Sequence, residues 1–156
     1  VHRELSFLYK KKVLFNELKS KSIKFNGYGN GWENGFCSEN EAIKLYSNSM
    51  FGFNMHNSSG PINFRLYDYA AFGVCQFCDC KSTLDYVFKD GEEIIGYSSA
   101  DEFVDLYSFY LKNKSIAKKI AFNARKRYLA DYNVEALWKK LNSFVNESVG
   151  IDLILD

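Results

Sequence analysis

The sequence lacks the features that mark several common protein classes. Proline occurs once, as Pro61, and no apolar run approaches the roughly 20 residues that a transmembrane helix needs. The first residues, VHRELSFLYKKK, carry charges where a secretory signal has its apolar stretch. We therefore expect no transmembrane segment and no secretion, and we predict a cytoplasmic protein.

The chain also lacks a start methionine and any low-complexity linker. It begins at Val1, so we expect it to be a piece of a longer protein. Its 156 residues, 47% of them hydrophobic and 25% charged, are enough for one domain with a buried core. We predict that this domain covers residues 1–148 and that residues 149–156 form an apolar tail.

A complete set of metal ligands is missing as well. Cys75, Cys78 and Cys80 form a C-x-x-C-x-C run, but neither His2 nor His56 is spaced to complete a four-ligand zinc site. The same run, VCQFCDC, is typical of a buried strand in which cysteine packs as a small hydrophobic residue. We predict reduced, metal-free thiols and no cofactor.

Arginine is scarce in the middle of the chain, where acidic residues dominate. Arg65 is the only arginine between Arg3 and Arg125, while basic residues gather in 1–24 and 112–140. These basic segments are typical of solvated helix faces, and no RNA-binding motif interleaves them with aromatic residues. We therefore expect no nucleic acid partner.

Short apolar segments alternate with helical patterns along the chain. Strands are predicted at 22–27, 50–56, 74–78 and 93–97, and helices at 1–20, 38–47, 61–72, 82–88 and through most of the chain after residue 99. Such alternation indicates a parallel sheet with right-handed crossovers. We predict an α/β, Rossmann-like domain of about four strands with a helical C-terminal third.

The segment GPINFRLYDYAAFG, residues 60–73, follows the second predicted strand. Pro61 suits the first position of a helix, whose unpaired N–H groups would face the ligand-binding edge of the sheet. Arg65 and Asp68 share one face of that helix, where a guanidinium suits phosphate oxygens and a carboxylate suits ribose hydroxyls. The pattern fits a nucleoside diphosphate site, and it fits a plain surface ion pair equally well.

Several short motifs succeed one another along residues 45–93. They are LYSNS at 45–49, NMH at 54–56, NFRLYD at 63–68 and AFG at 71–73, followed by Asp79 and by LDYVFKDGEE at 84–93. In this order and spacing they resemble the C-terminal domain of GT-B glycosyltransferases of the glycosyl transferases group 1 type, similar to spore-maturation-protein-like glycosyltransferases. The resemblance is strongest over about 45–98 and extends over about 3–145.

The resemblance implies one of two Rossmann-like domains that face each other across a cleft. This one would bind a nucleotide-sugar donor without a metal, and the acceptor domain would precede it in the full-length protein. Asp68 would contact the ribose, and Arg65 with the amides of Gly60–Asn63 would hold the diphosphate. The residues implied near the base are Gly27, Tyr28, Gly29 and Trp32.

Two departures from the family pattern leave a second interpretation open. Related retaining enzymes carry another carboxylate eight residues before Asp68, where this chain has Gly60, and their second acid is usually a longer Glu. The missing first carboxylate favours a non-catalytic Rossmann-like module that binds a nucleotide or a protein. The presence of Arg65, Asp68 and a glycine loop on one edge favours a sugar-transferring enzyme of the hexosyltransferase type, inactive as the isolated chain.

Two further residues each allow two roles, and a third is expected in the core. His56 can donate to a sugar or a phosphate, or it can be a loop histidine bonded to backbone. Trp32 can stack on a base or cover the sheet edge. Trp138 lies on an apolar helical stripe, and we predict it in the core.

Overall fold

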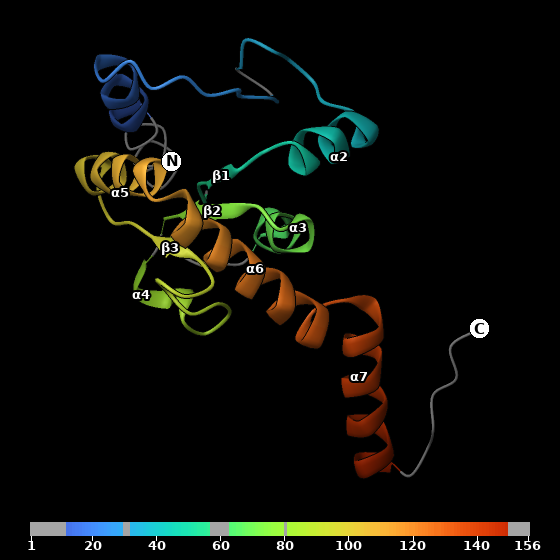
Figure 1. Cartoon of the computed structure of the whole chain (residues 1–156). Coiled ribbons are helices and arrows are strands. Elements are labelled where there is room, and N and C mark those ends of the chain that lie inside the picture. Colours follow the sequence, from blue (N-terminus) through green and yellow to red (C-terminus); the bar gives the residue numbers. More distant parts are fainter. Residues whose placement is uncertain (1–11, 30–31, 57–62, 80, 150–156) are drawn as a thin grey trace, which may run out of the picture.

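The structure, a computed structural model, describes residues 12–29, 32–56, 63–79 and 81–149. Three short strands form one parallel sheet in the order β1–β2–β3, with helices between and after them (Figure 1). The predicted α/β fold with a parallel sheet is therefore confirmed. After a helix over residues 12–20, the elements are α2 (Glu39–Ser47), β1 (Phe51–Asn54), α3 (Phe64–Phe72), β2 (Cys75–Cys78), α4 (Lys81–Leu84), β3 (Ile95–Gly96), α5 (Ala100–Lys112), α6 (Lys114–Asp131) and α7 (Val134–Val149).

The central strand β2 is buried on both faces of the sheet. Cys75 and Phe77 belong to one core cluster, with the helix of residues 12–20, α5 and the first half of α6. Cys78 belongs to a second cluster with α3, the end of α4 and Ala124 of α6. Because side chains alternate across a strand, helices cover both sides of β2, as expected of a parallel sheet.

The segment 22–27, predicted as a fourth strand, is not part of the sheet. Its described backbone has no regular secondary structure, and residues 24–26 are exposed. Ring packing holds it instead, since the Phe25 ring lies 5.2 Å from that of Phe15 and 5.7 Å from that of Trp32. Its apolar side chains indicated contact with the core but could not specify pairing with β1.

Helix ends follow side-chain caps where these are available. Ser38 and Glu41 form the predicted capping box of α2, and Gly73 ends α3 in the left-handed conformation, with φ of 67°. However, α3 begins at Phe64 with Asn63 as its N-cap, so the predicted start at Pro61 is wrong. Asn63 supplies a side-chain acceptor to the first turn, which proline cannot do.

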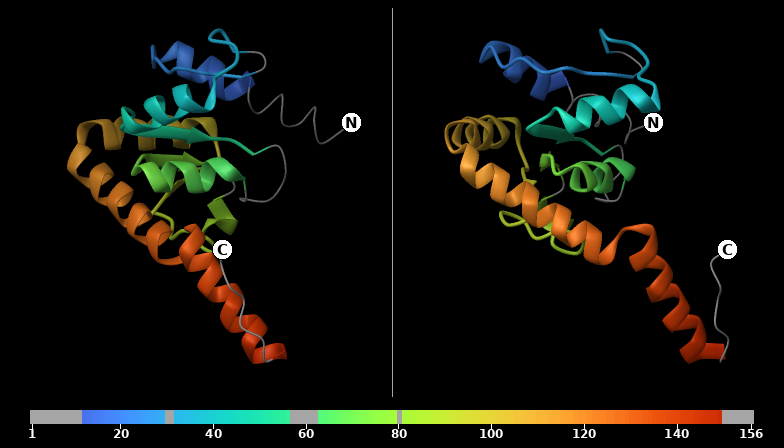
Figure 2. Two further views of the ribbon diagram at one scale, coloured as in Figure 1. Left: turned by 90° about the vertical axis from the view of Figure 1, so that its right-hand side faces the viewer. Right: turned by 45° about the vertical axis from the view of Figure 1, so that its right-hand side comes forward.

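Helix α7 extends away from the rest of the domain (Figure 2). None of its residues is buried, and Val134 and Phe144 are 74% and 68% exposed. Trp138 is therefore only half-buried, and its predicted place in the core is wrong. An apolar stripe predicts that a helix has an apolar face but not what covers it. No helix in the described ranges is long and apolar enough to cross a membrane.

Candidate functional site

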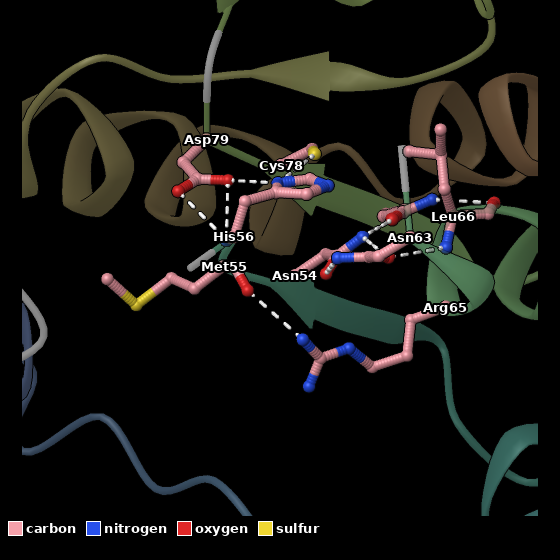
Figure 3. Close-up of polar contacts among 9 residues, drawn as sticks. Asn54, Met55, His56, Asn63, Arg65, Leu66, Cys78 and Asp79 are labelled. Carbon is pink, nitrogen blue, oxygen red and sulfur yellow. Dashed lines mark hydrogen bonds and ion pairs between the residues drawn. The ribbon is translucent and has the colours of Figure 1, made fainter. Parts of the chain in front are cut away.

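The carboxyl ends of β1 and β2 lie side by side and carry the candidate site (Figure 3). The two strands pair in parallel as far as Asn54 opposite Cys78. Beyond them the chain continues into Met55 and His56 on one side and into Asp79 on the other. In open parallel sheets this edge is where ligands bind.

Three amide side chains fasten the start of α3 to these strand ends. Asn54, fully buried in β1, donates from Nδ2 to Oδ1 of Asn63 at 3.0 Å and to Oε1 of Gln76 at 2.9 Å. Asn63 donates back from Nδ2 to Oδ1 of Asn54 at 2.9 Å. Buried amides need such partners, and here the partners belong to three different elements. The network therefore fixes the position of α3 on the sheet edge.

The same network completes the first turn of α3. The Oδ1 atom of Asn63 accepts from the backbone N–H of Leu66 at 3.2 Å, and Gln76 donates from Nε2 to the Leu66 carbonyl at 3.2 Å. The first N–H groups of a helix have no acceptor within the helix and give its N-terminus positive potential. That end of α3 is thus held beside the carboxyl end of β1, where it can bind an anion.

Arg65 adds a positive charge at the same edge. Its side chain is exposed and donates from Nη2 to the carbonyl oxygen of Met55 at 3.0 Å. The guanidinium therefore lies over the end of β1, and its other donors can meet a phosphate. The charge of Arg65 influences Asp68, but no ion pair joins these two described side chains, since Arg65 bonds to Met55 instead. The alternative of a plain surface ion pair is therefore not observed.

Asp68 lies about one turn further along α3 and is partly buried. Burial raises the pKa of its carboxyl group, and the charge of Arg65 opposes this shift. Burial also raises the pKa of the Tyr46 hydroxyl, on α2, and the nearby Asp68 charge adds to it. The carboxylate and the phenol are therefore close enough for their charges to interact, and both are partly desolvated.

His56 and Asp79 are bonded to each other at the strand ends. Both carboxylate oxygens of Asp79 accept from the His56 backbone N–H, each at 3.1 Å, and Oδ1 is in close contact with Nδ1 of the ring. The His56 side chain is only 1% exposed, and among the described residues its Nε2 has no hydrogen-bond partner. Both the backbone and the ring of His56 are therefore bound to a carboxylate, not to a backbone carbonyl.

The neighbouring Cys78 makes this pair a conceivable metal site. Its Sγ lies 3.9 Å from Nδ1 of His56, and the three donor atoms of His56, Cys78 and Asp79 all lie within 4.8 Å of one another. Zinc binds these three ligand types. In the structure the histidine and the carboxylate meet directly, which accounts for their closeness without an ion.

The glycine loop implied near the base is tied to another part of the domain. The Trp32 ring lies over Gly27 and packs edge-on against Phe15, at 4.7 Å between ring centroids. Phe15 in turn packs against Phe53 of β1, 6.2 Å away. Trp32 therefore covers Gly27, and it is connected to β1 through Phe15. The other implied loop residues are Tyr28, which is 38% exposed, and Gly29, with φ of 105°.

The structure thus gathers His56, Asn63 and Arg65 around the end of β1, with Asp68 further along α3. Gly60 lies outside the described residues. Sequence reasoning gave no role to Asn54, Gln76 and Asp79, which hold this region together. A signal existed for the amides: each interrupts an otherwise apolar strand, and a buried amide requires a partner.

Comparison with known proteins identifies the type of domain. A family model described as glycosyl transferase-like matches residues 3–143. No curated protein sequence matches the chain. Two solved structures are similar. One is HepE from Anabaena in complex with UDP-glucose, with a TM-score of 0.60 and 14% identity over 77% of this chain and 33% of that chain. The other is the C-terminal domain of LpcC, a glycosyl transferase group 1 family protein from Francisella tularensis, with a TM-score of 0.58 and 16% identity over 86% of this chain and 66% of that chain.

These likenesses establish a fold shared with part of HepE and with the C-terminal domain of LpcC. The chain spans about a third of the length of the HepE chain.

Proposed function

Because the chain belongs to the glycosyl transferase-like family, we propose that it is the donor-binding domain of a GT-B glycosyltransferase. The observation that carries this proposal is the reciprocal bond between Asn54 and Asn63, which presents the N-terminus of α3 at the carboxyl end of β1. Arg65 reaches the same edge. The similarly folded HepE was solved with UDP-glucose, which supports a nucleotide sugar as the ligand class.

The donor diphosphate binds between the start of α3 and the Arg65 guanidinium. Helix N–H groups and a guanidinium both donate charge-assisted hydrogen bonds to phosphate oxygens. As the sugar leaves, negative charge grows on the diphosphate, and these fixed donors stabilise it. This arrangement meets the charge with groups of the chain itself, so no metal is required.

Asp68 binds the ribose of the donor. It lies further along α3 than Arg65, so a nucleotide whose phosphates lie at the helix start can extend its ribose along the helix. A carboxylate accepts hydrogen bonds from two vicinal hydroxyls, which inorganic phosphates lack. Asp68 therefore distinguishes a nucleoside diphosphate from pyrophosphate.

Transfer of the sugar requires an acceptor-binding domain in addition to the donor-binding domain proposed here. A catalytic site must orient the acceptor against the donor and exclude water, and a single wall of a cleft does neither. The isolated chain accordingly binds the donor nucleotide without turnover.

Calorimetric titration with UDP, GDP and ADP tests the proposal. We expect a Kd of about 10 μM to 1 mM for the preferred nucleotide, which is ~4–7 kcal/mol of binding free energy. Arg65→Ala should weaken binding by about 1.5–3 kcal/mol because a charge-assisted bond is lost. Asp68→Ala should weaken binding of the nucleotide but not of pyrophosphate.

Arg125→Ala is the matched control for charge. Arg125 is exposed, and its Cδ approaches Gly73 at the opposite end of α3, so its loss should leave affinity unchanged. If no nucleotide binds at millimolar concentration, or if Arg65→Ala binds as well as the wild type, the donor site is wrong. The non-catalytic module then becomes the better interpretation.

A further inference from the structure

The His56–Asp79 pair lies at the proposed donor site, yet neither residue is used by the contacts described above for the donor. We propose that Asp79 is a positioning residue, which holds the His56 ring so that Nε2 meets an oxygen of the donor diphosphate. This inference rests on the proposed function and names the group that completes the phosphate site.

The backbone of Asp79 is itself bonded to the neighbouring strand. Its backbone N–H donates to the carbonyl oxygen of Asn54 at 3.3 Å, which ties the end of β2 to the end of β1. Its carboxylate then accepts from the His56 backbone N–H through both oxygens and contacts Nδ1 of the ring. One carboxylate thus sets both the backbone and the ring orientation of one histidine, which is how catalytic and metal-bound histidines are commonly oriented.

The opposite edge of the ring is left for a ligand. Nε2 is buried, and it has no hydrogen-bond partner among the described residues. A buried polar atom without a partner is unfavourable, so a ligand that supplies one is bound more tightly. Figure 3 shows this edge of the ring turned away from Asp79, on the side of Asn63 and the start of α3.

The chemistry of the surroundings selects an anion. With Nδ1 against a carboxylate, the proton of the neutral ring stays on Nδ1, and Nε2 can donate only when the ring is protonated. The start of α3 favours negative charge, so a phosphate oxygen is the acceptor for the hydrogen bond that protonated Nε2 donates. The ring takes that proton from solvent as the ligand binds, and no covalent bond of the donor changes.

The charged and titratable groups that face the ring come from two elements. Asp79 contacts Nδ1 and the thiol of Cys78 lies 3.9 Å from Nδ1, both at the end of β2. From α3, the guanidinium of Arg65 lies at the carbonyl of Met55, next to His56 in the chain. A bound diphosphate adds negative charge beside these groups and supplies an acceptor for a proton on Nε2.

Nitrogen NMR of 15N-histidine-labelled chain tests this directly, because the sequence holds only two histidines, His2 and His56. In the ligand-free chain, the His56 proton should reside on Nδ1. Adding UDP or pyrophosphate should protonate Nε2 of His56 and leave the His2 signals unchanged. In calorimetry, binding should take up a proton, and affinity for pyrophosphate should depend on pH in the wild type.

Two variants separate positioning from folding. His56→Gln should bind pyrophosphate about tenfold more weakly, as expected for one lost charge-assisted bond, and should lose the pH dependence. Asp79→Asn should also weaken binding and should change the His56 tautomer seen by NMR, which a purely structural role would not do. If either variant fails to fold, the proposal is tested on the wild type alone, by the His56 tautomer in NMR and by proton uptake in calorimetry.

The outcomes are distinguishable. If the wild type binds neither UDP nor pyrophosphate, both the donor site and this inference fail. If it binds them while the His56 signals stay unchanged, or if Asp79→Asn keeps the wild-type tautomer and pH profile, only this inference fails. Zinc added alone that binds stoichiometrically and shifts the His56 signals would assign the cluster to a metal and also overturn it.

Discussion

The start of α3 and the glycine loop flank the same strand, β1, but different forces hold them. Directional hydrogen bonds among Asn54, Asn63 and Gln76 fasten α3 to the sheet. The loop has hydrogen bonds among its own residues, such as Gly29 to Gly35 at 2.6 Å, whereas its Trp32 ring packs against Phe15 and Phe25. The preceding segment 22–27 has no place in the sheet. Hydrogen bonds fix distance and direction, whereas ring contacts tolerate sliding. The side proposed for the phosphates is therefore fixed by hydrogen bonds to the sheet, and we expect the side implied for the base to adapt.

Beside each region a glycine lies beneath an aromatic ring: Gly52 of β1 beneath Tyr69 of α3, and Gly27 beneath Trp32 of the loop. A Cβ at Gly52 would lie 2.7 Å from Cε1 of Tyr69, and a Cβ at Gly27 would lie 2.0 Å from Cε3 of Trp32. Tyr69 is anchored, since its hydroxyl donates to the carbonyl of Phe53 at 3.3 Å. The response of each region to an added methyl group therefore reports how firmly that region is held.

The largest effect is expected from Asn54→Ala. It removes a hydrogen-bond partner of both Asn63 and Gln76, and Gln76 is buried where water cannot replace that partner. Leaving buried polar groups unpaired should lower the free energy of unfolding by about 2–4 kcal/mol. Urea denaturation measures this loss. Asn26→Ala, at an exposed asparagine of the segment 22–27, is the matched control and should change stability little.

The next largest effect is expected from Gly52→Ala. The strand on one side and the anchored Tyr69 ring on the other leave no simple escape for the new methyl group. We expect a loss of about 2–3 kcal/mol, as for an overpacked core. The double variant Gly52→Ala, Tyr69→Phe frees the ring from Phe53 and should recover part of this loss. A loss that the second substitution leaves unchanged would show that Tyr69 is not the constraint.

Gly27→Ala should cost less, although its clash is the shorter of the two. The Trp32 ring is only partly buried and packs edge-on against Phe15 and Phe25, so we expect it to swing outward. We expect about 1 kcal/mol, together with a red shift of tryptophan fluorescence as the ring meets water. The background Trp138→Phe leaves Trp32 as the only tryptophan. A loss as large as that of Gly52→Ala would contradict the distinction between a fixed and an adaptable region.

Local sequence signals predicted the fold well where one residue decides the structure. The capping box at Ser38 and the left-handed Gly73 each need only their own backbone, and both are observed. The parallel sheet was predicted from another local signal, the alternation of short apolar strands with helical patterns. The start of α3 was misplaced because Pro61 and Asn63 are both helix-start signals, and the choice depends on Asn54, a partner on another strand.

The candidate site was less predictable because its geometry depends on strand register. Asn54 meets Gln76, and His56 meets Asp79, only because β1 pairs in parallel with β2 in the observed register. The order of motifs predicted the family correctly, since that order survives without any knowledge of contacts. It could not predict that a residue following β2 orients a residue following β1.

The smallest effect concerns pH, and it separates the buried side of α3 from an exposed helix cap. Burial raises the pKa of Asp68 above its ordinary 3.8, so the folded state favours the protonated carboxyl. Its contribution to stability is fully present below pH 3.8 and is lost as the pH rises through the higher pKa of the folded state. Asp68→Asn should abolish this loss, and urea denaturation at a series of pH values between these limits should show it.

Glu41 gives the opposite sign and serves as the internal comparison. Hydrogen bonds from the side chain and backbone of Ser38 lower its pKa below 4.5. Its stabilising contribution is present above pH 4.5 and is lost as the pH falls through the lower pKa of the folded state, so Glu41→Gln should reduce the stability lost on acidification. Both effects should be small, because Asp68 is only partly buried and Glu41 is exposed. If Asp68→Asn and Glu41→Gln changed the pH dependence in the same direction, Asp68 would be a solvated surface carboxylate. Its assignment to a partly desolvated ribose site would then lose its support.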